Sequence, residues 1–386
     1  MSPENATVRI SATIPVPLSE QIPLAQGYGR TLAQGLFADR DHPAYRRATM
    51  DGICFSSREP LGTINGFLAA GQAPPTEWRV GDVWEIMTGA SVPEACDCLV
   101  PYEDFEIDAV QRIVLREPPV PGRFIHAQGS DMASGREALS AGTLLGPMEL
   151  AVAASFGQEM LTVFRKPRIA LISTGDEVVP VHASPAPWQI RLSHAEMLRP
   201  SLLREGASLL HRHAADEPDA LRALLEEIAP QVDVILFTGG ISKGKKDCIR
   251  EVIEATRGAP AFHGVAQKPG KPMAFWPGTP LLFALPGNPL SVFATYCRYV
   301  APALRAWQGA SAKPLSIRLA ARPVAHPSLT LLLPVKIDDD GSYAAMNFSN
   351  SGNLLASRGA VGIVEVPCAQ TGLAAVSYPF YPYLIT

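Results

Sequence analysis

Residues 166–308 alternate apolar runs with amphipathic ones, and this alternation constrains the fold more than any other feature. The runs that predict strands are 168–174, 207–213, 232–238, 272–276 and 281–285. The runs that predict helices are 194–205, 217–229, 246–256 and 289–307. This order predicts a mostly parallel sheet with helices on both faces. Since such sheets bind ligands outside the carboxyl ends of their strands, we expect the functional site there.

The remaining segments predict a multidomain fold of α/β plus β type. Residues 46–124 contain short strand-like runs between turns and no long helix, which predicts an inserted β-rich domain. Residues 1–45 and 125–165 flank it and are expected to form one discontinuous linker domain. Residues 166–308 then form a three-layer α/β domain, and residues 309–386 a C-terminal β-barrel-like domain. A chain of 386 residues is long enough for several cores.

Composition excludes some classes of function. The chain carries 33 basic and 37 acidic side chains, a net charge of −4, whereas nucleic-acid binders usually have a basic excess. No apolar run reaches about 18 residues, and the N-terminus lacks the apolar core of a signal peptide. We therefore expect a cytoplasmic protein without nucleic-acid or membrane partners. The six cysteines include no Cys-x-x-Cys pair, which favours buried thiols over a metal site.

The first predicted strand of the α/β domain ends at Thr174, Gly175, Asp176 and Glu177. Glycine permits a tight turn, and two adjacent carboxylates provide the oxygen ligands that Mg²⁺ prefers. The alternative is a helix N-cap followed by an acidic first turn. Asp216, in the run Asp-Glu-Pro-Asp, is a further candidate acid, although this run is also typical of a helix N-terminus.

A glycine-rich block follows the predicted strand 232–238. It contains Gly239, Gly240, Ser242, Gly244 and Asp247, with lysines at 243, 245 and 246. The spacing nearly matches the phosphate-binding loop of nucleoside triphosphatases, but a lysine stands where that loop needs Ser or Thr for Mg²⁺. The block therefore predicts a looser phosphate cradle, in which backbone N–H groups and a helix N-terminus bind an anion. Asp247 is its candidate metal ligand or orienting base.

Two lysines and a rigid turn flank the last predicted strand, 281–285. Lys268 and Lys271 precede this strand, and their ammonium groups suit phosphate or an oxyanion such as molybdate. Pro286, Asn288 and Pro289 belong to a Pro-Gly-Asn-Pro turn after it, and Asn288 is expected to cap the following helix. Exposed lysines beside an ordinary strand–helix turn are the alternative interpretation.

Two further motifs lie in the predicted insertion. Asp51 in Met-Asp-Gly and Thr88 in Met-Thr-Gly each place a polar side chain beside glycine, in positions that suit either a ligand or a turn. Asp131, after Gly129 and Ser130, is similar.

Together, these blocks resemble the molybdopterin molybdenumtransferase family, of the MoeA and gephyrin E-domain type. The matching blocks follow the family order across nearly the whole chain. They are MDG at 50–52, IMTGASVP at 86–93, STGDE at 173–177, GGISKGKKD at 239–247, KPGKPMAF at 268–275 and LPGNPLSVF at 285–293.

The resemblance implies an enzyme of molybdenum cofactor biosynthesis, in which the α/β domain binds molybdopterin. Such an enzyme inserts molybdate into adenylylated molybdopterin and releases AMP with the help of Mg²⁺. It is typically a homodimer, whose cleft lies between the α/β domain of one subunit and the inserted domain of the other. The molybdopterin adenylyltransferase is a possible further partner of the chain.

The resemblance also assigns residues. The implied catalytic residues are Asp51, Thr88, Glu177, Asp216, Asp247, Lys268 and Lys271. Those implied to bind the cofactor are Thr174, Gly175, Asp176, Gly239, Gly240, Ser242, Gly244, Pro286, Asn288 and Pro289, and the implied metal ligands are Glu177 and Asp247.

The sequence departs from the family pattern near the expected site. Ile53 and Cys54 follow Asp51-Gly52 where Tyr-Ala is usual, and His194 stands in place of an asparagine in a Asp-Ser-Asn element. The departures leave an alternative open, in which a catalytically weak paralogue binds molybdopterin or acts as a scaffold. A nucleotide hydrolase that shares the α/β domain is a third hypothesis, against which the inserted and C-terminal domains argue.

Overall fold

The computed structural model describes residues 1–206, 208–241, 248–310, 313–348, 350–369 and 377–383. Two compact units emerge from its contacts. The first combines residues 1–20 with 163–386, and the second consists of residues 21–162. Among the described helices, none has both the length and the apolar character that a membrane crossing requires.

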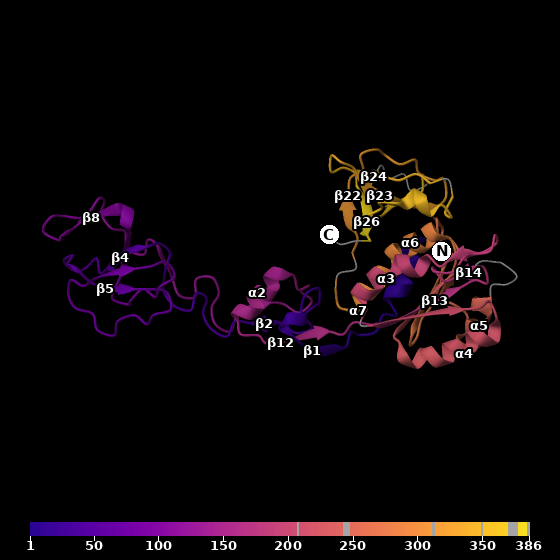
Figure 1. Cartoon of the computed structure of the whole chain (residues 1–386), viewed down its shortest axis with the longest axis horizontal. Coiled ribbons are helices and arrows are strands. Elements are labelled where there is room, and N and C mark those ends of the chain that lie inside the picture. Colours follow the sequence, from indigo (N-terminus) through magenta and orange to yellow (C-terminus); the bar gives the residue numbers. More distant parts are fainter. Residues whose placement is uncertain (207, 242–247, 311–312, 349, 370–376, 384–386) are drawn as a thin grey trace. The chain divides into compact units, whose positions relative to one another are not determined.

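A six-stranded sheet forms the centre of the first unit (Figure 1). Its strand order is β16-β13-β17-β21-β20-β18, in which the first four strands are parallel and the last two antiparallel. The bounds are β13 Arg168–Thr174, β16 Ser208–Ala214, β17 Val234–Thr238, β18 Phe262–His263, β20 Ala274–Trp276 and β21 Leu281–Leu285. The alternation of the sequence thus predicted the parallel strands correctly.

Helices cover both faces of this sheet, with α3, α6 and α7 on one face and α4 and α5 on the other (Figure 1). Their bounds are α3 His194–Glu205, α4 Pro218–Ile228, α5 Cys248–Arg257, α6 Pro289–Thr295 and α7 Ala301–Trp307, with short turns η3 Ala229–Gln231 and η4 Tyr296–Val300. The π-helical turn η4 joins α6 to α7. Pro302 lacks the N–H that an α-helical ladder would need there, which accounts for the wider turn.

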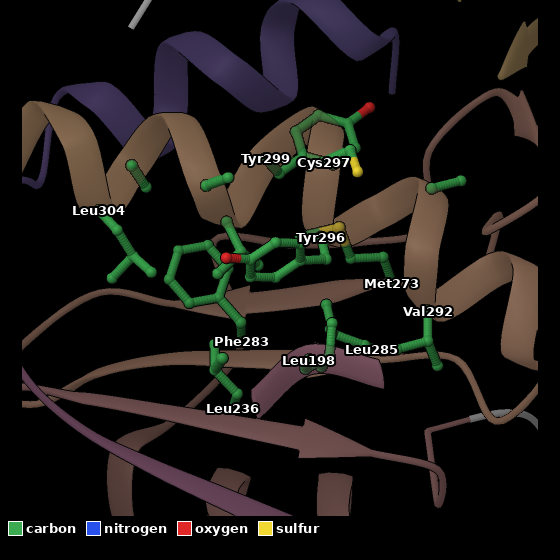
Figure 2. Close-up of a cluster of buried hydrophobic side chains, with 14 of the residues drawn as sticks. Leu198, Leu236, Met273, Phe283, Leu285, Val292, Tyr296, Cys297, Tyr299 and Leu304 are labelled. Atoms are coloured by element: carbon green, nitrogen blue, oxygen red, sulfur yellow. The ribbon is translucent and has the colours of Figure 1, made fainter. Parts of the chain in front are cut away.

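Both faces of the central strands are apolar because alternate residues enter different cores. Ile169 and Leu171 of β13 pack on the side of α3, α6 and α7, whereas Ala170 and Ile172 pack on the side of α4 and α5. Figure 2 shows Leu236 and Phe283 of the sheet beneath Tyr296 of the helical layer. This period of two, buried on both sides, is typical of a parallel sheet between two helical layers.

The N-terminal helix α1, Pro3–Ser11, belongs to the same unit. Its buried residues Ala6 and Ile10 join the core on the α3 side, and Thr7 Oγ1 accepts a hydrogen bond of 2.8 Å from Arg298. The first 20 residues therefore group with the α/β core, which differs from the expected linker segment 1–45. The physical reason is the apolar stripe of α1, which only a core can bury.

A second sheet follows in the C-terminal part of the first unit. Its strand order is β19-β23-β25-β26-β22, with β24 beside β23. The bounds are β19 Gln267–Lys268, β22 Leu315–Ile317, β23 Thr330–Ile337, β24 Tyr343–Ala345, β25 Gly362–Val366 and β26 Tyr378–Pro382, with the turn η5 Leu354–Ser357. Leu332 and Ile363 face the α/β core, whereas Val335 and Val364 form a separate core.

A buried ion pair ties this sheet to the helical layer. Arg298 Nε lies 2.6 Å from Glu365 Oε2, and the exposed fraction of each side chain is 7%. Tyr381 donates a hydrogen bond of 3.0 Å to the same carboxylate oxygen. The guanidinium also lies over the rings of Tyr299 and Tyr381. One cation thus joins α1, η4 and strands β25 and β26.

The second unit contains a four-stranded sheet of order β5-β6-β4-β7. The bounds are β4 Gly52–Phe55, β5 Ile64–Leu68, β6 Val83–Ile86 and β7 Cys98–Pro101, followed by η2 Tyr102–Asp104 and the hairpin β8 Phe105–Ile107 and β9 Ile113–Leu115. Cys54, Cys96 and Cys98 are fully buried, as predicted. This β-rich part lies within the range 46–124 that the sequence indicated.

Short paired strands and one helix make up the rest of residues 19–164. The pairs are β1 Ser19–Pro23 with β12 Met160–Phe164, β2 Leu36–Phe37 with β11 Glu137–Leu139, and β3 Arg47–Ala48 with β10 Ile125–His126. The helix is α2 Pro147–Ser155, and η1 Leu24–Gln26 is a short turn.

We expect Glu365→Gln to destabilise the protein, because it leaves the buried Arg298 without a counter-charge. The expected loss is about 3 kcal/mol, or roughly 6–12 °C in Tm, measured by thermal unfolding of the full chain. The control is Asp338→Asn, which removes the half-exposed partner of Lys336 and should cost less than about 1 kcal/mol. Equal effects of the two variants would contradict the proposed role of the buried pair.

Candidate functional site

The loop after β13 makes a tight turn at the carboxyl edge of the α/β sheet. Gly175 has φ +125°, and an added Cβ there would lie 2.9 Å from each carboxylate oxygen of Glu177. Glu177 is exposed and directly precedes the short strand β14, Val178–Val179. Since no helix begins at this point, the alternative of a helix N-cap is wrong for this motif.

The loop after β16 meets the loop after β13. The N–H of Asp216 donates a hydrogen bond of 3.3 Å to Asp176 Oδ1. The next residue, Glu217, caps α4 by accepting from the N–H of Ala220 at 2.7 Å. The run Asp-Glu-Pro-Asp is therefore a helix N-terminus, as its alternative interpretation held. It also brings Asp216 beside the loop of residues 175–177.

The loop after β17 packs against the same edge. Gly239 and Gly240 have φ of +98° and +60°, and a Cβ on either would lie 3.0 or 2.9 Å from Thr174 Oγ1. This buried hydroxyl has no hydrogen-bond partner in the part of the chain that the structure describes. Two glycines are thus required for close packing over an unsatisfied polar group.

The loop after β21 lies beside the loops after β13 and β17 at the same edge of the sheet. The N–H of Gly239 donates to the carbonyl of Leu285 at 3.2 Å, and Gly239 Cα is the nearest neighbour of a Cβ built on Gly287, at 3.6 Å. The loops that contain Thr174, Gly239 and Gly287 therefore form one continuous surface at the carboxyl ends of β13, β17 and β21. Ser242, Gly244 and Asp247, also predicted for this site, lie outside the described residues.

A pocket of about 440 Å³ adjoins this surface. Lys268, Lys271, Pro286 and Asn288 line it, so four predicted residues from two segments share one cavity. Both lysines are exposed, whereas Pro286 is buried. Pro289 does not line the pocket, but it is the first residue of α6 and ends the Pro-Gly-Asn-Pro turn.

The loop that carries the lysines is held from beneath. Gln267, which is fully buried, donates to the carbonyl of Gly270 at 3.2 Å and accepts a short hydrogen bond from Tyr299. Gly270 has φ +89°, and a Cβ there would meet Thr295 Cγ2 at 2.5 Å. The backbone between the two lysines is therefore fixed while their ammonium groups stay in solvent.

The C-terminal sheet region also contributes to the pocket. Asn288 occupies the N-cap position of α6 but makes no side-chain cap. Its Nδ2 instead donates to Ser351 Oγ at 2.9 Å, which corrects the expected capping role, and Ser351 O accepts the N–H of Leu290 at 3.1 Å. Asn350 and Ser351 line the pocket and were missed from the sequence. The polar run of residues 350–353, Asn-Ser-Gly-Asn, is the signal that could have indicated a loop at a site.

In the second unit, Asp51 and Thr88 form a direct contact. Asp51 Oδ1 accepts the Thr88 backbone N–H at 2.6 Å and its hydroxyl at 2.7 Å. These two hydrogen bonds, first that of the backbone, lower the pKa of the Asp51 carboxyl. Two motifs 37 residues apart thus combine into one exposed, ionised carboxylate with a fixed orientation.

Comparison with known proteins identifies the family. Residues 1–157 match the model of the MoeA N-terminal region (domain I and II), and residues 170–306 match that of a probable molybdopterin binding domain. A molybdopterin molybdenumtransferase from a Synechocystis species is 32% identical, over 92% of this chain and 93% of that protein. The chain belongs to the molybdopterin molybdenumtransferase family.

Solved structures of MoeA proteins have the same mixed α/β fold with several sheets. One molybdopterin biosynthesis MoeA protein from Pyrococcus horikoshii is 28% identical, with a TM-score of 0.78 over 95% of this chain and 94% of that one. A second structure from this organism has a TM-score of 0.82 over 99% of this chain and 97% of that one, at 21% identity.

We expect Thr88→Val to raise the pKa of Asp51 partway toward its ordinary value. The variant removes the hydroxyl donor that favours the carboxylate and keeps the backbone N–H donor. The measurement is a carboxyl ¹³C NMR titration of the full chain. Asp340, whose pKa is lowered by a hydrogen bond from the Ser342 N–H, is the internal reference and should not move. An unchanged Asp51 titration would contradict the contact.

We expect Gly240→Ala to destabilise the protein more than Gly258→Ala does. Both glycines have positive φ, but a Cβ at 258 meets nothing within 4 Å, whereas one at 240 lies 2.6 Å from the buried Ile249 Cδ1. The comparison separates crowding from backbone strain. Crowding should add about 1–3 kcal/mol to the loss in free energy of unfolding of Gly240→Ala. Denaturant unfolding of both variants measures the difference, and equal losses would refute close packing of this loop.

Proposed function

We propose that this chain inserts molybdate into adenylylated molybdopterin and releases AMP, as a step of molybdenum cofactor biosynthesis. Membership of the family supports the reaction class. The observation that carries the proposal is the pocket in which Lys268 and Lys271 lie beside Pro286 and Asn288, next to the glycine-rich carboxyl edge of the sheet. The cationic pocket suits an oxyanion, and the adjoining carboxyl edge of the sheet, where α/β domains commonly bind nucleotides, suits a nucleotide-linked substrate.

The lysines would gather molybdate electrostatically. Neither ammonium group forms an ion pair with a described residue, so both keep their full attraction for an anion. The fixed backbone at Gly270 limits how far they can follow a ligand, which favours a preorganised site. The turns at Gly239 and Gly240, which pack over the buried Thr174 hydroxyl, would contact the pterin or phosphate part of the substrate.

The acidic loops fit Mg²⁺ through their donor chemistry. Asp176, Glu177 and Asp216 are oxygen donors on two adjoining loops, and Mg²⁺ in phosphate chemistry often needs only one or two carboxylates. No group of three or more metal-binding side chains occurs among the described residues, and Asp247, the other predicted ligand, lies outside them. We propose Glu177 as the principal ligand. Bound Mg²⁺ would neutralise negative charge on the phosphates of the substrate.

We also propose the architecture and assembly that the family implies. The chain would have four domains: a discontinuous linker domain, an inserted β-rich domain, the molybdopterin-binding α/β domain and a C-terminal β domain. It would act as a homodimer in the cytoplasm, and the carboxylate of Asp51, oriented by Thr88, would complete the cleft of the other subunit. The molybdopterin adenylyltransferase is the proposed supplier of the substrate.

We expect Lys271→Gln and Lys268→Gln each to lower kcat/KM for molybdate about 100-fold, because each removes one preorganised positive charge from the pocket. AMP release from adenylylated molybdopterin, molybdate and Mg²⁺ is the assay. Lys336→Gln is the matched control, since it removes an exposed lysine that does not line the pocket. A chelator should abolish release, and added Mg²⁺ should restore it.

Other results would assign a different function. Substrate binding by the wild-type protein without AMP release would support the scaffold alternative. Hydrolysis of unrelated nucleotides would support the hydrolase. Full activity of both lysine variants would remove the pocket from the mechanism.

A further inference from the structure

Trp188 is placed unusually for a tryptophan. Its exposed fraction is 76%, whereas Trp276 and Trp307 are buried and Trp78 and Trp84 are only partly exposed. Tryptophan is a large apolar residue that is usually mostly buried. None of the roles proposed above uses this side chain.

Strand pairing brings the turn that carries Trp188 close to Glu177 in the loop after β13. Strand β15, Ile190–Arg191, pairs in parallel with β14, with Val178 opposite Ile190. The N–H of Ile190 donates to the carbonyl of Glu177 at 2.9 Å, so the start of β15 lies directly beside Glu177. Trp188 stands two residues before Ile190, in the turn that precedes β15. Paired strands are about 4.8 Å apart, so this turn begins one strand spacing and two residues from Glu177.

The turn that carries Trp188 is well braced. The N–H of Gln189 donates to the carbonyl of Ala186 at 2.9 Å, and Gln189 Oε1 accepts the N–H of Ala186 at 3.1 Å. Arg191 Nε donates to the carbonyl of Ala183 at 3.1 Å. The loop therefore presents an exposed aromatic ring on a fixed backbone, which reduces the entropy lost when a ligand binds.

We propose that Trp188 is a stacking platform for a fused nitrogen heterocycle of the substrate. The inference rests on the proposed function, in which the substrate carries two such rings, the adenine and the pterin. Asp176 and Glu177 are suited to a metal ion that binds phosphate, and either ring lies a short covalent distance from a phosphate of that substrate. Indole stacks on any such ring without needing a specific hydrogen-bond pattern.

Steady-state kinetics of AMP release test the proposal. Trp188→Ala should raise KM for adenylylated molybdopterin about tenfold, the size of one lost stacking contact, with kcat changed less than about twofold. Trp188→Phe, which keeps an aromatic ring, should recover most of the loss. Val181→Ala is the matched control, because it truncates another exposed side chain of the same loop. A wild-type KM in an active Trp188→Ala enzyme overturns the inference and leaves the proposed function intact.

Fluorescence titration distinguishes the two rings and does not require turnover. The difference between the emission of wild type and Trp188→Phe isolates the exposed indole from the other four tryptophans. Quenching of this difference by AMP assigns the adenine, and quenching by a free pterin assigns the pterin. If the wild-type protein shows no AMP release, the proposed function fails. If, in addition, neither AMP nor the free pterin quenches the indole emission of the wild-type protein, the stacking role is refuted as well.

Discussion

Burial of both faces of strands β13, β17 and β21 is the constraint on which the site depends. Each strand sends alternate residues into two separate apolar cores, so no polar side chain fits along its length without the cost of desolvation. Polar and flexible residues are therefore confined to the strand ends. The parallel order then brings three of those ends to one edge, where Thr174, Gly239 and Gly287 come together.

The second requirement is a fixed position for the C-terminal sheet, since it supplies one wall of the pocket. Asn350 and Ser351 can line the cavity of Lys268 and Lys271 only if this sheet stays against the helical layer. The buried pair of Arg298 and Glu365 provides that attachment, with shared apolar contacts through Leu332 and Ile363. The ion pair joins one specific residue of each layer, whereas apolar packing alone is not directional.

The sequence predicted the parts of the site that depend on local pattern. Strand and helix periodicity located the carboxyl ends of β13, β17 and β21, and turn chemistry indicated the loops at Gly175, Gly239 and Pro286. It also named Asp51 and Thr88, whose direct hydrogen bonds depend on a long-range pairing of β4 with β6. That pairing was not itself predictable from either motif.

What could not be predicted arises from contacts between distant segments. Asn288 has an ideal capping sequence, yet it makes no side-chain cap, and its Nδ2 donates to Ser351, 63 residues away in the chain. Helix α1 lies in the segment that the sequence assigns to the linker domain, and only the distant core explains its packing. The acidic motif at Glu177 has a helix start as its alternative interpretation, and its continuation into β14 is decided by pairing with β15.

The order of the strands also determines where the charged side chains lie at the two edges of the α/β sheet. At the amino edge of the sheet, Asp233 is bound by Arg165 and Arg168, whose hydrogen bonds overcome the effect of burial and lower its pKa to about 2. At the carboxyl edge, the acids follow β13 and β16, whereas the lysine pocket adjoins β21, two strands from β13. Two strand spacings amount to about 10 Å, slightly more than the Debye length of about 8 Å at physiological ionic strength. The acids and the lysine pocket therefore adjoin different strands of one edge. Such a separation suits an elongated ligand that is anionic at one end and binds metal at the other.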